Sequence, residues 1–160
     1  MEIERISERN RREINRFIKD HWFSTEMVVR GQMIDMAALD GFVMYDNSAI
    51  VGLITYRITG QECEIMSLNS IKENKGIGTA LIHEAVRYAK ERKCEIIKLI
   101  TTNDNINAIR FYQKFGFDIV RFYRNAMEEA RMLKPSIPII GENGIPLRHE
   151  IEFEMDISTN

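Results

Sequence analysis

The chain has 160 residues, of which 44% are hydrophobic and 29% charged, and its formal net charge is −2. This length suits one domain with a substantial core, and the composition is far from the low-hydrophobicity pattern of disordered chains. The 22 basic and 24 acidic residues are spread along the chain, which disfavours nucleic acid or an anionic membrane as a partner. We therefore expect a single domain over residues 1–160.

Two cysteines, Cys63 and Cys94, lie inside apolar or strand-like runs, and neither has another cysteine or a histidine at metal-ligand spacing. Both are interpreted as buried, reduced thiols, and no metal site is expected. Residues 1–17 are charged throughout and lack the apolar core of a signal peptide, and no later run approaches the length of a membrane span. A cytoplasmic location without a membrane partner is the expectation.

The N-terminal part combines a strand, a helix and an ambiguous stretch. Residues 2–6 alternate as in an edge strand, and Ser7 offers a cap for a helix whose apolar face is Ile14, Phe17 and Ile18. Residues 24–39 leave two interpretations open, because Val28 and Val29 favour a strand while the residues that follow fit either a helical turn or an extended segment.

Three β-rich runs follow, separated by turn-forming residues. Asp46-Asn47-Ser48 breaks the first run from the second, and Thr59-Gly60 breaks the second from the third. The pattern predicts an antiparallel meander with strands at Phe42–Tyr45, Ala49–Arg57 and Gln61–Leu68.

Beyond the meander the apolar period changes from that of a strand to that of a helix. A helix is predicted from Ile77, then a strand at Glu95–Thr101, then a second helix that Asn105 opens and Gly116 ends. The inner face of this second helix is expected to be Ala108, Phe111, Tyr112 and Phe115. A strand, helix, strand order implies a right-handed crossover and parallel pairing of the two strands.

The last part is predicted as a strand after Gly116, a helix at 124–134, a loop rich in proline and glycine at 135–146, and a closing strand at 148–157. In the closing strand the apolar residues alternate with polar ones: Ile151, Phe153, Met155 and Ile157. The predicted architecture is mixed α/β, with a meander, a crossover unit and a terminal strand.

Two glycines, Gly76 and Gly78, stand where the predicted strand passes into the helix, with Lys75 before them. Glycine is a poor helix residue, but a glycine turn at a helix N-terminus exposes amide groups that can bind an anion. The Walker pattern is absent, because no Lys and Ser/Thr pair follows Gly78, and Leu81 stands where a dinucleotide motif needs its third glycine. Tight helix packing is the alternative structural explanation for the two glycines.

Two motifs together resemble the GNAT superfamily of acyl-CoA-dependent N-acyltransferases. The first is the glycine segment, which is similar to the family's Arg/Gln-x-x-G-x-G/A motif. The second, N-x-x-A-x-x-F-Y-x-x-x-G-F, is matched by Asn105, Ala108, Phe111, Tyr112, Gly116 and Phe117. The resemblance covers residues 2–122 and implies a GNAT-like α/β fold, with an antiparallel meander, splayed central parallel strands and flanking helices.

The resemblance implies acetyl-CoA as the acyl donor and no metal. The pyrophosphate would lie on the backbone amides of Asn74, Lys75, Gly76, Ile77, Gly78 and Thr79, and the pantetheine arm would pair with the backbone of Met66, Ser67 and Leu68. Asn105 is either a plain helix cap or a cap that also reaches the cofactor. Glu73 stands where the family carries Arg or Gln, and Lys75 or Lys72 would compensate.

Attack of an amine on a thioester requires an oxyanion donor, a base for the amine and an acid for the departing sulfur. A backbone N–H near Leu68 is expected to be the donor, and Tyr112, at the family's tyrosine position, the acid. Glu64 is the candidate base, acting directly or through water, although Glu62 on the same strand face could replace it if a bulge intervenes. A solvated strand carboxylate is the alternative interpretation of Glu64, and packing against Phe111 and Phe115 that of Tyr112.

The resemblance therefore implies an N-acetyltransferase that acts through a ternary complex on a primary amine of a small molecule or peptide. The alternative is a catalytically silent acyl-CoA-binding or sensing module, which the departure at Glu73 keeps open. The acceptor is expected to contact variable segments around His21, Trp22 and Phe23, at Met33–Met36, and in the excursion at 125–148, which would otherwise serve as a dimer contact.

Overall fold

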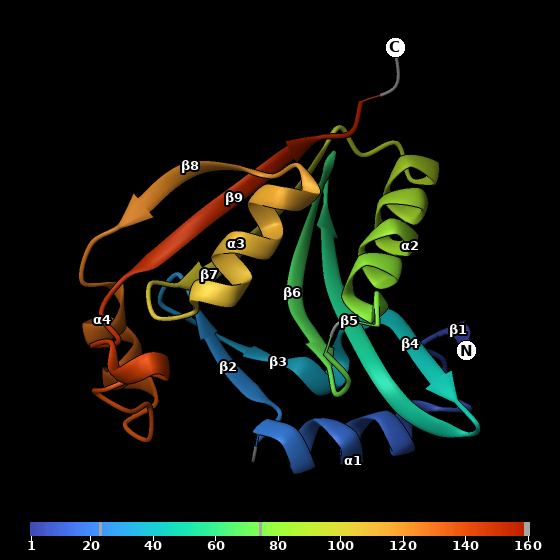
Figure 1. The fold of residues 1–160 in the computed structure, drawn as a ribbon, viewed down its shortest axis with the longest axis horizontal. Helices are drawn as coiled ribbons and strands as arrows, with labels where there is room; N and C mark the ends of the chain where they lie inside the picture. Colours follow the sequence, from blue (N-terminus) through green and yellow to red (C-terminus); the bar gives the residue numbers. More distant parts are fainter. Residues whose placement is uncertain (23, 74, 159–160) are drawn as a thin grey trace. The chain divides into compact units, whose positions relative to one another are not determined.

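The structure is a computed structural model that describes residues 1–22, 24–73 and 75–158 (Figure 1). The chain forms two compact units. The first consists of Met1–Glu26, Asp35–Ile97 and Asp156–Asn160, and the second of Met27–Ile34 and Lys98–Met155. The single-domain organisation stays a prediction. No helix in the described part of the chain combines the length and the apolar run that a membrane crossing needs.

The first unit contains the predicted meander. Strands β1 (Glu2–Arg5), β4 (Asp40–Asp46), β5 (Ala49–Thr59) and β6 (Glu62–Ser70) lie in that order, each antiparallel to the next. Asn47 and Ser48 both have positive φ, of 50° and 71°, as the tight hairpin turn between β4 and β5 requires. The prediction of an antiparallel meander is confirmed.

Two helices belong to the first unit. Helix α1 (Arg11–Trp22) buries Ile14, Phe17 and Ile18 as predicted, and α2 (Ile77–Glu91) packs against β4, β5 and β6. The expectation that Ser7 caps α1 is wrong. The helix begins at Arg11 because the side chain of Asn10, which is buried, accepts the Ser7 N–H and donates to the Arg5 carbonyl.

The ambiguous stretch at 24–39 is a hairpin followed by a helical turn. Strands β2 (Glu26–Val29) and β3 (Gln32–Asp35) form a two-stranded sheet, and the positive φ values of Arg30 and Gly31 make the turn. The 3-10 helix η1 (Met36–Ala38) comes next, with Asp35 accepting the Ala37 N–H. Both local interpretations therefore hold, each for one part of the stretch.

The second unit holds most of the remaining elements. Strands β7 (Ile96–Thr102), β9 (Glu150–Asp156) and β8 (Asp118–Tyr123) lie in that order, with β8 antiparallel to β9 at the end of the sheet. The first two residues of β7 and the last residue of β9 belong to the first unit. Helix α3 (Ile106–Phe115) precedes β8, and α4 (Ala126–Leu133) and the 3-10 turn η2 (Glu142–Gly144) follow it. A small apolar cluster of Met127, Ala130 and Leu147 fixes α4, with Val28 and Ile137 packed against it.

The predicted closing strand is β9, but its burial does not follow the alternation of apolar and polar residues. Phe153 is fully buried, and Glu150 and Glu152, at polar positions, are also buried, with exposures of 4% and 3%. Ile151 and Met155 are only partly buried. The reason for Glu152 is charge pairing, because its carboxylate lies against the guanidinium groups of Arg30 and Arg121.

The fold class is mixed α/β, as predicted. The described residues form four α-helices and two groups of strands, one in each unit, with antiparallel pairing between β1, β4, β5 and β6 and between β8 and β9. The splay of the two central strands stays a prediction.

Candidate functional site

The glycine turn that begins α2 has the backbone of an anion site. Gly76 is the N-cap residue, with φ 73° and ψ 11° in the left-handed region, and it offers no side chain to the amides of the first turn. A Cβ atom built on Gly76 meets nothing within 4 Å. Close packing therefore does not explain Gly76, whereas its positive φ does. The amides of Ile77, Gly78 and Thr79, at the positive end of the helix dipole, form the first turn.

Three charged residues, Lys72, Glu73 and Lys75, precede the glycine turn. Lys75 and Glu73 are both exposed, and Asn74 lies outside the described residues. Lys72 donates a hydrogen bond of 2.8 Å to Asp46, and this bond and charge hold the pKa of Asp46 below its usual value. Lys72 is thus engaged elsewhere, which leaves Lys75 as the cation beside the turn.

Strand β6 carries a bulge at the residues expected to bind the pantetheine arm. Ser67 faces Thr55, but the next residue of β5, Tyr56, faces Ile65, so Met66 is the extra residue. The Thr55 and Ser67 hydroxyl groups are joined by a hydrogen bond of 2.5 Å beside the bulge. A bulge interrupts the ladder and turns local backbone groups away from it. The structure places Met66, Ser67 and Leu68 together at this irregularity.

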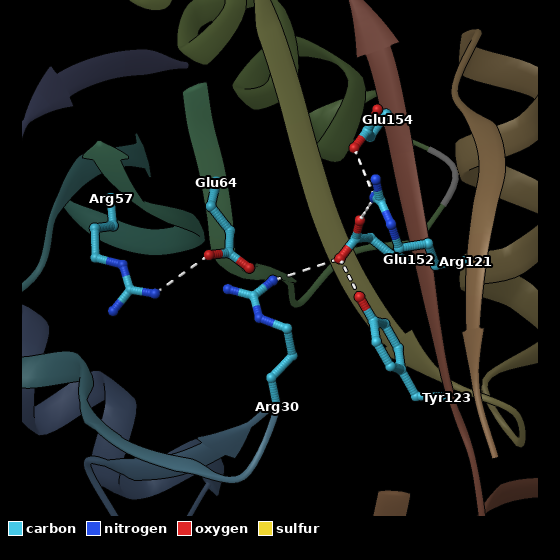
Figure 2. Close-up of polar contacts among 7 residues, drawn as sticks. All are labelled: Arg30, Arg57, Glu64, Arg121, Tyr123, Glu152 and Glu154. Atoms are coloured by element: carbon cyan, nitrogen blue, oxygen red, sulfur yellow. Dashed lines mark hydrogen bonds and ion pairs between the residues drawn. The ribbon is translucent and has the colours of Figure 1, made fainter. Parts of the chain in front are cut away.

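Glu64 lies on β6 opposite Arg57, before the bulge. Its carboxylate is 4% exposed, and its Oε1 atom is 3.3 Å from Nη2 of Arg57 (Figure 2). The interpretation of Glu64 as a solvated carboxylate is therefore wrong. Glu62, which is half-buried, keeps its regular pairing with Thr59, so no bulge exchanges it with Glu64.

Tyr112 lies in the second unit, on the buried side of α3. Its exposure is 8%, and its ring is surrounded by those of Phe111, Phe117 and Phe153 at centroid distances of 5.4 to 5.7 Å. Burial raises the pKa of Tyr112 to about 12. The hydroxyl group therefore stays protonated, and able to donate, throughout the neutral range.

Asn105 is the N-cap of α3. Its side-chain oxygen accepts the Ala108 N–H at 3.3 Å, and its amide donates to the Thr101 hydroxyl at 3.4 Å. The helix-cap part of the prediction is confirmed, whereas a reach to the cofactor stays a prediction.

Sequence reasoning missed the residues that hold the excursion at 125–148. Asp104 is 5% exposed, and its carboxylate accepts bonds from the Thr102 hydroxyl at 2.5 Å and the Glu142 N–H at 2.8 Å. Asn103 accepts the N–H groups of Arg148 and His149, each at 2.9 Å. The run TTNDN after an apolar strand signals caps and turns, but it carries no sign of partners some 40 positions away.

Cys63 and Cys94 are unpaired and buried, and burial raises the pKa of Cys63 to about 12. Within the described residues, no group of three or more His, Cys, Asp or Glu side chains is placed to hold a metal ion.

Known proteins resemble this chain in sequence and in fold. The sequence matches the model of the Acetyltransferase (GNAT) family over residues 7–117. The uncharacterized protein YdhI of Bacillus subtilis is 51% identical over 138 residues, which cover 86% of each chain. The acetyltransferase PseH of Campylobacter jejuni is 31% identical over 123 residues, 74% of this chain and 78% of its own.

A solved structure extends the likeness to the fold. The structure of a Bacillus subtilis acetyltransferase in complex with CoA superposes with a TM-score of 0.67 at 21% identity, covering 96% of this chain and 97% of the other. The family match takes in Glu64, the glycine turn and Tyr112, and it spans well over half of the sequence. The chain therefore belongs to the acetyltransferase (GNAT) family.

Proposed function

We propose that this protein transfers an acetyl group from acetyl-CoA to a primary amine of a small molecule or peptide. The observation that carries the proposal is the left-handed Gly76 at the N-terminus of α2, which leaves the first-turn amides without a side-chain cap, next to the exposed Lys75. The CoA complex of the similar Bacillus subtilis acetyltransferase supports the choice of donor.

In this proposal the donor is held by backbone groups. The amides from Asn74 to Thr79 bind the pyrophosphate, and the backbone of Met66, Ser67 and Leu68 receives the pantetheine arm. The bulge at Met66 supports this role, because a regular β6 would direct its backbone groups into the ladder with β5.

The reaction is direct attack within a ternary complex. The amine nitrogen bonds to the thioester carbon, the carbon–sulfur bond breaks, and the electron pair of that bond leaves with the sulfur. A backbone N–H near Leu68 stabilises the oxyanion, Glu64 takes a proton from the nitrogen directly or through water, and Tyr112 donates its O–H to the departing sulfur. The protonated state of Tyr112 at neutral pH fits a donor, and the burial of Glu64 beside Arg57 fits a fixed carboxylate.

The first experiment measures the melting temperature with acetyl-CoA, CoA, ATP and NAD added separately. A ligand at about a hundred times its dissociation constant stabilises the folded state by about 2.7 kcal/mol, which a melting curve detects. Selective stabilisation by acetyl-CoA and CoA is expected, followed by CoA release when a panel of amines is added. Absence of a shift with either CoA species would contradict the proposal.

A silent acyl-CoA-binding module is the second candidate, favoured by the exposed Glu73 at the position of the family's Arg or Gln. The substitution Tyr112→Phe separates the two, because it removes only the hydroxyl group of a ring held by three aromatic neighbours. An enzyme should lose roughly tenfold or more in kcat and keep its donor affinity. The matched control Tyr45→Phe should change neither. A protein that binds acetyl-CoA but releases no CoA with any amine would be the module.

We infer that the acceptor contacts the segment around His21, Trp22 and Phe23, the segment Met33–Met36 and the excursion at 125–148, and that the protein works in the cytoplasm. Phe23 lies outside the described residues. The acceptor contact is testable by exchanging residues 125–148 with the matching segment of YdhI, which should change the preferred amine and leave the donor affinity unchanged.

A further inference from the structure

Strand β8 ends the sheet of the second unit. It pairs with β9 along one edge and is the last strand in the sheet order, drawn in orange beyond β9 in Figure 1. The outer edge of such a strand presents backbone N–H and C=O groups that can pair with another chain. Proteins usually protect this kind of edge with charged side chains, Pro, a β-bulge or a covering element.

Strand β8 carries a bulge and two charged residues, but it also exposes three apolar side chains. Ile119, Val120 and Phe122 are 50%, 41% and 56% exposed, in a segment without Lys or Pro. Because Val120 is the extra residue of a bulge, Ile119 faces Phe153 and Phe122 faces Ile151 across the ladder. Ile119 and Phe122 therefore share the face of the sheet that packs on α3 through Phe153 and Tyr112.

We infer that β8 is the contact surface between two copies of this chain. In the dimer, the β8 strands of the two copies pair antiparallel about a two-fold axis between Val120 and Arg121. This register places Ile119 opposite Phe122 of the second copy, and Phe122 opposite its Ile119. Four exposed apolar side chains then cover one another on one face of a continuous sheet.

On the opposite face of β8, charged residues of one copy lie near residues of opposite charge on the second copy. Asp118 and Arg121 face Glu154 and Glu152 of β9, so both lie on the face away from Phe153. In the same register Asp118 lies diagonal to Arg121 of the second copy, within reach of a long side chain. The two Arg121 side chains near the axis do not repel strongly, because each is paired with Glu152 and Glu154 of its own chain.

The bulge at Val120 limits the pairing to a short segment, and a two-fold contact uses up both edges. Assembly therefore stops at the dimer. This contact replaces the excursion at 125–148 as the expected dimer surface, and it does not depend on the acetyl transfer proposed above.

Sedimentation of the full chain at about 1 to 100 μM tests the inference, because this range covers micromolar association. We expect a dimer, and a monomer for the double variant Ile119→Lys/Phe122→Lys, in which lysines oppose each other. The matched control Ile139→Lys, at a residue that is 71% exposed on the loop after α4, should remain a dimer. A monomer at every concentration, or a dimer unaffected by the double variant, would overturn the inference.

Disulfide trapping tests the register and does not depend on the lysine variant folding. Directly opposed residues of an antiparallel pair are close enough for a disulfide, and the protein's own Cys63 and Cys94 are buried. Under mild oxidation, Ile119→Cys/Phe122→Cys should form a covalent dimer, whereas either single cysteine should not. Failure of the double variant to cross-link at concentrations where the chain sediments as a dimer would reject β8 as the contact.

Discussion

Gly76 and Gly60 offer a comparison at the scale of single residues. Both have positive φ, of 73° and 59°, and a Cβ atom on either meets nothing within 4 Å. Replacing either with alanine should therefore cost the same free energy of unfolding, about 1 kcal/mol, from left-handed strain. Only Gly76→Ala adds a methyl group where the proposed pyrophosphate approaches.

We expect Gly76→Ala to weaken acetyl-CoA binding roughly tenfold or more, and Gly60→Ala to leave it unchanged, as measured by calorimetric titration. Equal affinities for the two variants would mean that the turn does not hold the donor, even if both lose the same stability.

The buried hydroxyl group of Tyr112 should make the free energy of unfolding depend on pH in the alkaline range. Burial raises the pKa of Tyr112 from its usual 10.0 to about 12 in the folded protein, so the unfolded chain loses this proton first as the pH rises. The stabilisation is complete below pH 10 and is lost between about pH 10 and 12, by an amount on the order of 2 to 3 kcal/mol.

Urea unfolding at about pH 8 and 11 should therefore show the wild type losing more stability than Tyr112→Phe, because the other tyrosines titrate in both proteins and cancel. Parallel losses in the two proteins would show that Tyr112 titrates normally and is not desolvated.

Among the elements, the excursion at 125–148 is fixed to the rest of the second unit by contacts with Asp104. A Cβ atom on Gly141 would lie 2.1 Å from Oδ2 of Asp104, the same oxygen that accepts the Glu142 N–H. Gly141 has a negative φ, so only this close approach requires glycine. The loop and the end of β7 are thereby joined through one buried carboxylate.

Gly141→Ala should destabilise the protein by about 1 to 3 kcal/mol, as overpacking does, and should move the loop. Asp104→Ala removes most of the clashing atoms, so adding Gly141→Ala to it should cost little more. Gly144→Ala, whose cost arises from a positive φ of 70° in open space, should add to Asp104→Ala without coupling. Strict additivity in both double variants, measured by urea unfolding, would contradict the packing described.

The elements that the sequence predicted correctly are those governed by local rules. The meander turns, the buried face of α1 and the Asn105 cap follow from residues near each other in the chain. The bulge at Met66 could not be predicted, because it depends on the register of two strands. The burial of Glu152 could not be predicted either, because its partners are distant in the sequence: Arg30 lies in the β2–β3 turn and Arg121 on β8. A row of three glutamates on one strand face was nevertheless a signal that cations must face it.

At the scale of the whole molecule, the family match and the two units divide the chain differently. The match ends at residue 117, whereas the second unit continues through β8, α4 and β9 to Met155. The proposed donor and catalytic residues lie within the matched part, as does Met33–Met36, whereas β8 and the excursion at 125–148 lie beyond it.

Glu152 is the centre of a polar network within the second unit. Its Oε1 atom accepts the Tyr123 hydroxyl at 2.9 Å and lies 3.5 Å from Nη1 of Arg30, while Oε2 binds Arg121 (Figure 2). The carboxylate thereby ties the β2–β3 turn and β8 to β9. Glu154 binds the same Arg121 at 3.0 Å, but its side chain is 23% exposed against 3% for Glu152.

This pair provides a matched test. Glu152→Gln removes the charge that two guanidinium groups share in a buried position, and it should cost about 2 to 4 kcal/mol, whereas Glu154→Gln at the surface should cost less than about 1. Hydrogen exchange should then lose protection in β8, β9 and the β2–β3 hairpin while β4, β5 and β6 keep theirs, because the network lies within one unit. Equal costs for the two variants would mean that burial does not strengthen this ion pair. A uniform loss of protection across both units would mean that they unfold as one.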